Sequence, residues 1–412
     1  MYLFKNKPAI KFLLLISISI LLLIPSCKKE DEISFINDWD EDINYFSNNL
    51  KIKHINLFHN ITEAEFNQDI ATLRANTSIL SNIEINIELF KIISKIGDSH
   101  TSIGGISEFS TLPYKVDLLS DGLFITDISI ENQQYLGEKI ISINGIEINT
   151  VLDGFRAIIA NENESCFKWI VSSYLRISEL FNYFGYSDTP NSITLNLESG
   201  NSIILTSGTD AMVSIYTGII PPLFLSNTTD YYWYQKLDNN SILYIQYNRC
   251  SEQSDISFQT FTNQVSDIVN QYESLNKIVI DLRLNSGGNS SIAKPLIELL
   301  QYFVNNERIS SENIYVIIGR KTFSSAVLNS IELKGAIAPV FIGEPTGGKP
   351  NHYGEVESFL LPNSQLEVRY STKYFNWIQG DPSSIIPDVL IEFSSQDLIN
   401  GHDPILDYII SH

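Results

Sequence analysis

Apolar residues recur three and four positions apart from residue 38 to residue 96. This spacing places them on one face of a helix and predicts a series of amphipathic helices. Thr62 followed by Glu65 has the pattern of a capping box at a helix start. We therefore expect a helical domain over 38–105, preceded by a tether over 27–37. The apolar positions are Ile43, Phe46, Leu50, Phe66, Ile70, Leu73, Ile83, Ile87, Phe90 and Ile93.

The pattern changes to alternation between about 113 and 207. Apolar positions alternate through 137–143 and run into the turn signal Asn144-Gly145, which predicts a strand and a hairpin. This hairpin resembles the central hairpin of PDZ domains, and a helix beginning near Val151 would lie beside the peptide groove. A helical stretch over 166–184 is inserted into that pattern. The alternatives are a PDZ-like domain, which binds a peptide as an added strand, and a β-rich domain with no recognition role.

The rest of the chain, over 230–412, alternates strands with helices. Such alternation predicts βαβ units on a largely parallel sheet, in which ligands bind at the carboxyl ends of the strands. The fold class expected is therefore α/β. The strands are expected at 242–247, 277–282, 314–318 and 340–343, and the helices at 256–272, 291–304 and 325–333.

The amino end has the features of an export signal. Three lysines accompany an apolar run over 12–24, which is short for a membrane span but typical of a signal-peptide core. Ile24-Pro25-Ser26-Cys27 resembles a bacterial lipobox, so we expect 1–26 to be a lipoprotein signal peptide and Cys27 to be lipidated. An ordinary signal peptide is the alternative. The charged tract 28–32 resembles an export tag of surface lipoproteins, which predicts an outer-membrane anchor facing the periplasm or the cell surface.

The net charge of −21 argues against nucleic-acid binding, which requires clustered Lys and Arg. Removal of the three lysines with the signal peptide would bring the charge to −24. Of the three cysteines, Cys166 and Cys250 would remain unlipidated, and the sequence does not indicate whether they pair. The six histidines have no partners at metal-ligand spacing, so no metal or other cofactor is expected.

Two loops at strand ends have the residue types of a catalytic site. Gly287-Gly288 follows the expected strand at 277–282, and paired glycines let backbone N–H groups approach a ligand closely. Ser324 lies where the strand at 314–318 gives way to a helix, whose first N–H groups favour negative charge. Each feature alone is also common in ordinary turns and helix caps.

Together with three further motifs, these loops resemble the C-terminal-processing (tail-specific) serine peptidases and their tricorn-like relatives. The resemblance covers most of 90–393, with the motifs in the family's order. It implies a crotonase-like catalytic core, a PDZ-like domain and a polypeptide substrate. The matching segments are Asp98-Ser99-His100-Thr101, Asp281-Leu282-Arg283 with Asn285 and Gly287-Gly288, Thr322-Phe323-Ser324-Ser325-Ala326, Gly343-Glu344-Pro345-Thr346 and Ile386-Pro387-Asp388-Val389.

The family uses two catalytic schemes, and both remain open here. In the tricorn-like scheme, which we favour, His100 is the base for Ser324, Ser99 lies beside it and Asp381 supplies the acid. In the other scheme the base is Lys349, which follows Ser324 at a spacing like that of the family, although the motif around it is altered. Each residue also has a structural interpretation: His100 as a helix-capping loop residue, Lys349 as a solvated lysine and Asp381 as a turn residue.

The resemblance also predicts the oxyanion hole, with one backbone N–H from Ser325 and one from Gly287 or Gly288. Because Val327 replaces an acidic residue common in relatives, the alignment can shift by a position, which leaves Ser325 as the alternative nucleophile. Asp281 and Arg283 are expected to be architectural, pinning the glycine loop through charge-assisted hydrogen bonds.

The sequence thus predicts an exported, lipid-anchored serine endopeptidase. Two other classes of function remain on the same scaffold: a catalytically silent peptide-binding lipoprotein, and a hydrolase of non-peptide acyl compounds.

Overall fold

The structure is a computed structural model that describes residues 38–412. The predicted signal peptide, the lipidation at Cys27 and the predicted tether lie outside the described residues.

A six-stranded sheet forms the C-terminal half, in the order β16-β13-β12-β11-β10-β9. All neighbouring strands are parallel except β9 and β10, so the predicted, largely parallel α/β arrangement is confirmed. The strands are β9 (Tyr232–Leu237), β10 (Ile242–Tyr247), β11 (Lys277–Asp281), β12 (Ile314–Ile318), β13 (Val340–Gly343) and β16 (Val389–Leu390).

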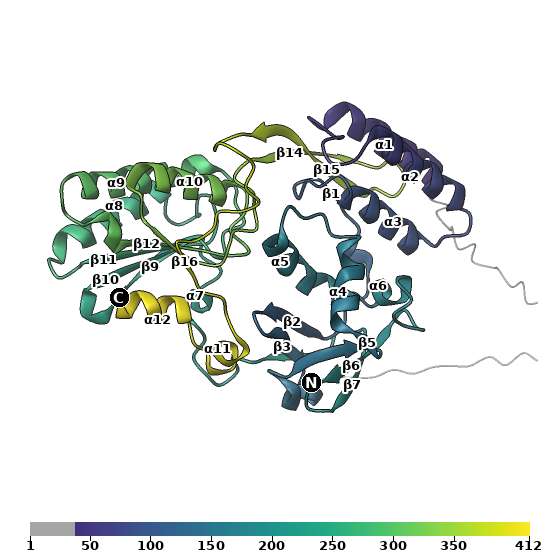
Figure 1. The fold of residues 1–412 in the computed structure, drawn as a ribbon, viewed down its shortest axis with the longest axis horizontal. Coiled ribbons are helices and arrows are strands. Elements are labelled where there is room, and N and C mark those ends of the chain that lie inside the picture. Colours follow the sequence, from purple (N-terminus) through teal and green to yellow (C-terminus); the bar gives the residue numbers. More distant parts are fainter. Residues whose placement is uncertain (1–37) are drawn as a thin grey trace, which may run out of the picture. The chain divides into compact units, whose positions relative to one another are not determined.

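Helices cover both faces of this sheet (Figure 1). Alternate residues of β11, such as Ile278 and Ile280, pack in one hydrophobic cluster with α8 (Phe258–Gln271), α9 (Lys294–Asn305) and α10 (Ser325–Ile337). Val279, between them, faces the opposite side and packs with α12 (Pro404–Ser411). The alternation places successive side chains on opposite faces, as expected for a strand buried on both sides.

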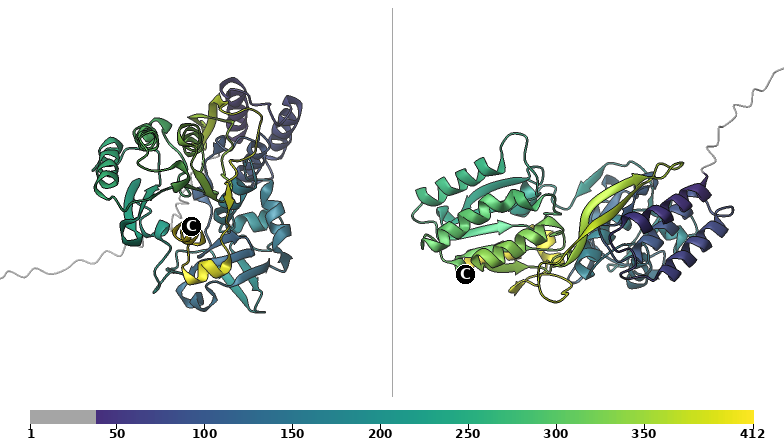
Figure 2. Two further views of the ribbon diagram at one scale, coloured as in Figure 1. Left: turned by 60° about the vertical axis from the view of Figure 1, so that its left-hand side comes forward. Right: turned by 90° about the horizontal axis from the view of Figure 1, so that it is seen from above.

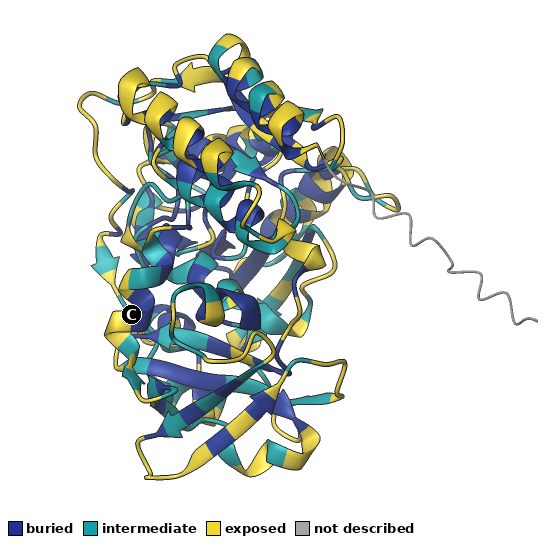
Figure 3. Cartoon of the chain, turned by 90° about the vertical axis from the view of Figure 1, so that its right-hand side faces the viewer, coloured by how far each residue is buried: buried dark blue, intermediate teal, exposed yellow. Residues whose placement is uncertain are grey.

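The predicted helices of the first third are α1 (Trp39–Lys53), α2 (Glu63–Asn76) and α3 (Asn82–Ser94). The predicted capping box is present: Thr62 and Glu65 exchange hydrogen bonds at the start of α2, and Ser81 and Glu84 do the same for α3. The apolar faces of the three helices are buried (Figure 3).

A second sheet has seven strands, with the path β2-β3-β4-β6-β7 and with β5 and β8 paired to β4 and β3. The predicted Asn144-Gly145 turn joins β4 to β5, and both residues have positive φ, at 51° and 78°. The strands are β2 (Tyr114–Leu119), β3 (Gly122–Ser129), β4 (Lys139–Ile143), β5 (Ile146–Glu147), β6 (Ser192–Leu197), β7 (Ser202–Thr206) and β8 (Met212–Ser214), with helices α4 (Ile148–Arg156), α5 (Glu164–Tyr174) and α6 (Ser178–Tyr183).

The helical region and this sheet share one continuous hydrophobic cluster. Phe90 of α3, for example, packs against Phe109 and against Tyr174 of α5. The two regions are therefore fixed to each other by apolar burial, which is the dominant favourable term in folding.

A long hairpin that the sequence pattern did not predict connects the two halves of the molecule (Figures 1 and 2). It consists of β14 (His352–Leu360) and β15 (Glu367–Phe375), and β15 also pairs with β1 (Ser102–Ile103). Although the hairpin follows the six-stranded sheet in sequence, its side chains Leu361, Leu366 and Val368 belong to the cluster of the N-terminal helices. Two short helices complete the fold, α7 (Leu223–Ser226) and α11 (Ser395–Asn400).

Among residues 38–412, no helix is long and apolar enough to cross a membrane.

Asp42 holds the tip of the long hairpin against α1, and its replacement should weaken the fold. The buried carboxylate accepts hydrogen bonds from the backbone N–H groups of Asn363 and Ser364, both at 2.8 Å. We expect Asp42→Ala to lower the free energy of unfolding by about 2–4 kcal/mol, since two backbone donors lose a buried, charged acceptor. Urea unfolding measures the change.

Asp40→Ala is the matched control, because Asp40 lies on the same helix but is exposed and paired only at the surface with Arg74. Its loss should cost less than about 1 kcal/mol. Equal effects of the two substitutions would show that Asp42 does not anchor the hairpin.

Candidate active site

Ser324 lies between the end of β12 and the first turn of α10, where it is the N-cap residue. Its backbone has φ 52° and ψ −125°, a conformation that costs a non-glycine residue free energy and is common at functional sites. Within residues 38–412 its hydroxyl makes no hydrogen bond. A serine held in a strained strand-to-helix turn presents its hydroxyl outward, as nucleophiles of acyl-transfer enzymes do.

Ser325, the alternative nucleophile, is engaged elsewhere. Its hydroxyl donates a hydrogen bond of 2.6 Å to the carbonyl of Gly288, and its side chain is buried. Of the two serines, only Ser324 therefore keeps its hydroxyl available for chemistry.

The glycine loop packs directly against Ser324. A Cβ on Gly287 would lie 2.7 Å from the Ser324 Cβ, closer than real Cβ contacts allow, and at a tight 3.0 Å from the Ser325 nitrogen. Gly287 and Gly288 also have φ of 106° and 134°. Both positions therefore require glycine, on steric and on conformational grounds.

A buried ionic network holds this loop at the end of β11. Arg283 donates to Asp281 through Nε at 2.8 Å and binds Asp403 with both terminal nitrogens, at 3.0 and 2.7 Å. Tyr244 adds a hydrogen bond of 2.6 Å to Asp281. The expected architectural Asp281–Arg283 pair is confirmed, and Asp403 is a partner that the sequence did not indicate.

The backbone N–H groups of Ser325 and Gly288, which lie in the serine loop and the glycine loop, have no partner within the described residues. The N–H of Gly287 donates instead to the Asn285 side chain at 2.9 Å. The sequence left Gly287 and Gly288 as alternatives for the second oxyanion donor, and this bond leaves Gly288 as the free one.

His100 lies next to the serine loop, since its ring stacks on that of Phe323 with centroids 4.5 Å apart. The ring of His352 also stacks with that of His100, at 5.3 Å. The His100 side chain is 8% exposed, and within residues 38–412 neither ring nitrogen has a hydrogen-bond partner. Burial lowers the pKa of His100 to about 4, so the ring is neutral at neutral pH.

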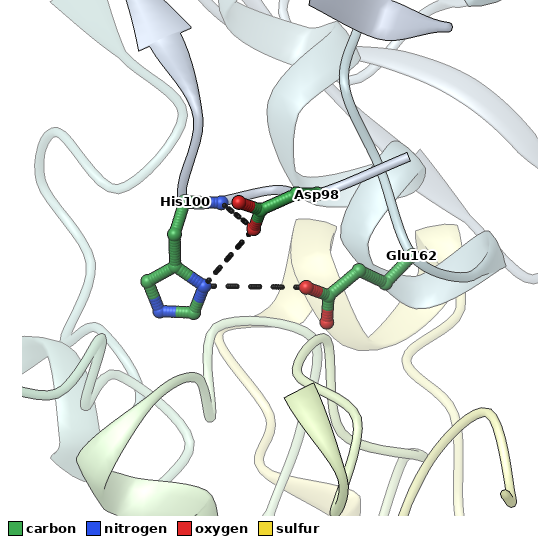
Figure 4. Close-up of side chains that lie close together, drawn as sticks. All are labelled: Asp98, His100 and Glu162. Carbon is green, nitrogen blue, oxygen red and sulfur yellow. Dashed lines mark hydrogen bonds and ion pairs between the residues drawn. The ribbon is translucent and has the colours of Figure 1, made fainter. Parts of the chain in front are cut away.

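Two carboxyl groups lie near Nδ1 of His100 (Figure 4). Asp98 Oδ1 is 3.8 Å away and Glu162 Oε1 is 4.0 Å away. Burial opposes the charge of Asp98, but hydrogen bonds from His54, Ser371 and Thr101 hold its pKa below the ordinary range. Burial and the charge of Asp98 raise the pKa of Glu162 to about 8.

Asp381, the acid that the sequence analysis assigned to His100, makes a different contact. Its carboxylate forms an ion pair with Lys349 Nζ at 2.8 Å, and the carboxyl groups that lie near the ring of His100 are those of Asp98 and Glu162 instead. Ser99, expected beside the base, lies with its Oγ 3.7 Å from Cys166 Sγ, and its N–H points to Glu162 at 3.4 Å.

Asp98, His100 and Glu162 are also the one group among the described residues whose ligand atoms lie close enough together to hold a metal ion, within 4.8 Å. The sequence gave no sign of this group because Glu162 comes from a distant segment. Asp98 has little capacity left for a cation, since its two oxygens already accept four hydrogen bonds. The two carboxyl groups are therefore better suited to positioning the His100 ring than to binding a metal ion.

Glu162 and His352 are the site residues that sequence reasoning missed. Glu162 lies in the polar run Asn161-Glu162-Asn163-Glu164, which has the composition of an ordinary loop. His352 begins β14 of the hairpin that was not predicted. Only the tertiary fold brings these two residues to His100, and no local signal marks them.

No family model matches the sequence, and no curated protein matches it. Among solved structures, the chain is similar to mature CPAF, with a TM-score of 0.60 and 13% identity over 90% of this chain and 95% of that one. For a structure of mature CPAF complexed with lactacystin, the TM-score is 0.61 and the identity 12%, over 90% of this chain and 96% of that one. For the photosystem II D1 C-terminal processing protease, the TM-score is 0.40 and the identity 12%, over 85% of this chain and 92% of that one.

The chain therefore has the fold of CPAF. The resemblance to the tail-specific peptidases, which the ordered motifs predicted, is confirmed at the level of the fold.

Gly287→Ala tests whether the glycine loop fixes the position of Ser324. The added methyl group would displace Ser324, and a displacement of about 1 Å in an active site can cost a hundredfold in rate. We expect at least that loss in the rate at which a fluorophosphonate labels the protein.

Gly218→Ala is the control, because Gly218 also has a positive φ, of 86°, but no atom within 4 Å of the added Cβ. It should keep the wild-type rate. A normal rate in Gly287→Ala would mean that the loop does not constrain the serine.

Proposed function

We propose that this protein is a serine peptidase that cleaves polypeptides through an acyl-enzyme on Ser324, with His100 as the general base. One observation carries the proposal above the others. Within residues 38–412, Ser324 has a hydroxyl without a hydrogen bond at a strained helix N-terminus. The N–H groups of Ser325 and Gly288 have no partner in the same range, and a buried, neutral histidine lies next to the serine loop.

The reaction uses these groups in turn. His100 takes the proton of the Ser324 hydroxyl as Oγ attacks the scissile carbonyl, and the N–H groups of Ser325 and Gly288 stabilise the oxyanion. The imidazolium then gives its proton to the leaving amine. Water, activated by the neutral ring, releases the acyl group and restores the serine.

The surroundings of Lys349 favour His100, and not Lys349, as the general base for Ser324. A lysine base must be neutral and desolvated, whereas the Lys349 side chain is 24% exposed and its ammonium is paired with Asp381. The backbone N–H of Lys349 contributes instead by donating to Glu162 at 3.2 Å.

The six-stranded sheet with its helices is proposed to be the crotonase-like core of the family. The seven-stranded sheet is proposed to be its PDZ-like domain, which would hold a polypeptide near its C-terminal tail as an added strand. Export and lipid anchoring through Cys27 would place this peptidase in the envelope of a bacterial cell, at the outer membrane.

Cleavage of casein and of an unstructured tail peptide tests the function. The purified protein should cleave at least one of them, and Ser324→Ala should abolish the cleavage while leaving the unfolding curve unchanged. Wild-type protein with no more turnover than Ser324→Ala on either substrate would contradict the proposal and favour a silent peptide-binding protein.

Substitution of each candidate base separates the two schemes. His100→Ala should reduce kcat/KM about a hundred- to ten-thousandfold, the usual contribution of a general base. Lys349→Ala should reduce it less than tenfold, because only the surface ion pair with Asp381 is lost. The reverse order of effects would assign the base to Lys349.

The pH dependence of kcat/KM gives an independent test. Only the neutral ring accepts a proton, so activity is lost as pH falls through the pKa of His100. Since that pKa is lowered from 6.5 to about 4, the limb of kcat/KM that His100 sets should lie near pH 4, with a fall of about tenfold per pH unit below it. An acid limb centred near 6.5 would show that the ring is solvated in the working enzyme.

A further inference from the structure

Nδ1 of His100 is a buried polar atom that has no hydrogen-bond partner among the described residues. If Nε2 is to take the serine proton, Nδ1 must carry the ring's own proton and needs an acceptor, because buried polar groups are almost always paired. Within residues 38–412 it has none at hydrogen-bond distance. Two carboxyl groups lie just beyond that distance, those of Asp98 and Glu162, at 3.8 and 4.0 Å (Figure 4).

Asp98 is already committed to holding the chain. Its Oδ1 accepts the backbone N–H of His100 at 2.8 Å, and its Oδ2 accepts Thr101 and Ser371, both at 2.6 Å. His54 Nε2 lies 3.1 Å from the same oxygen. These bonds fix Asp98 to β15 and to the end of α1, so it cannot turn toward the ring without breaking them.

Glu162 has the free capacity that Asp98 lacks. Among residues 38–412, its Oε1 accepts only the long bond from the Ser99 N–H, at 3.4 Å, and its Oε2 accepts only the Lys349 N–H, at 3.2 Å. When it is ionised, a carboxyl group has about four acceptor positions, so two remain. The side chain is 3% exposed, and water therefore does not compete for them.

The segment that carries Glu162 is fixed at the active site by its neighbour. Asn163 caps α5, where its side-chain oxygen accepts the Cys166 N–H at 2.8 Å. Its side-chain nitrogen donates to the carbonyls of Thr346, Gly347 and Ser383, at 3.2, 3.0 and 2.6 Å. The loop between α4 and α5 is thereby fastened to the loop that precedes Lys349.

We propose that Glu162, and not Asp381, is the positioning residue of the catalytic histidine, and that it accepts a hydrogen bond from the Nδ1–H group of His100 as Nε2 takes the proton of Ser324. This inference rests on the proposed peptidase function. The orienting acid then comes from the β-rich region of the chain, and a small closure of about 1 Å brings Oε1 within hydrogen-bond distance of Nδ1.

The surroundings of the pair set its charge. Asp98 and Glu162 face Nδ1, and the ring of His352 stacks with that of His100. Burial, and with it the positive charge of Arg369 on β15, lowers the pKa of His100. Lys349 and the Cys166 thiol lie near Glu162. Because burial raises the pKa of Glu162 to about 8, this carboxyl gains its negative charge, and with it a stronger hold on the imidazolium, as pH rises past 8.

The test measures the second-order rate at which a fluorophosphonate labels Ser324. Glu162→Gln keeps the size of the side chain but cannot ionise, and should slow labelling at least tenfold at pH 9, where the wild-type carboxyl group is charged. Asp381→Asn should slow it less. In Ser-His-Asp proteases, replacing the acid of the triad with its amide lowers kcat about ten-thousandfold. Glu179→Gln is the matched control, since Glu179 is also buried and accepts a backbone N–H, from Ser110, at a site unconnected with His100.

The pH profile separates positioning from a merely structural role. Between pH 6 and 9 the wild-type labelling rate should rise as Glu162 ionises, and Glu162→Gln should lose that rise. Wild-type rates and profile in Glu162→Gln, or a larger loss in Asp381→Asn, would overturn the inference while leaving Ser324 as the nucleophile. A wild-type protein that does not label at all would overturn the proposed function and the inference together.

Discussion

The approach of Gly287 to Ser324 is the contact on which the candidate site depends. A serine with φ of 52° is unfavourable by itself, and the surrounding chain must hold it there. The glycine loop does so from one side, because no side chain larger than hydrogen fits at Gly287. The loop in turn keeps its place through the Arg283 network, whose three buried charged groups satisfy one another. The strain at Ser324 is thus maintained by an ionic network at the end of β11.

A different part of the chain positions the histidine next to this serine. His100 belongs to the N-terminal part of the chain, and the long hairpin β14–β15 joins that part to the six-stranded sheet. Asp98 is bound to Ser371 of β15, and the ring of His100 stacks with those of Phe323 and His352. The site is therefore assembled from segments that lie far apart in the sequence, and its geometry depends on the packing of the hairpin.

The elements with strong local signals could be predicted from the sequence. The strand at 242–247 and the helix starting at Ser325 lie where periodicity placed them, and Thr62 with Glu65 forms the capping box that the pattern indicated. The pairing of Asp281 with Arg283 followed from their position at a strand end. In these cases the residues that determine the structure are close together in the sequence.

Contacts between distant segments could not be predicted in this way. The hairpin β14–β15 packs against helices from the opposite end of the described chain, and Glu162 lies in a polar run like many others. Asp381 was assigned to His100 by its place in a motif, yet a lysine ammonium is its partner in the fold. A motif fixes the order of residues along the chain, whereas the partner of a charged group is decided by tertiary packing.

The central claim is that Ser324 is an activated nucleophile, and identification of the residue that a fluorophosphonate modifies tests it most directly. We expect one phosphonyl group per chain, located on Ser324 by mass spectrometry of peptides, and none in Ser324→Ala. Modification of Ser325, or the same labelling in wild type and Ser324→Ala, would contradict it.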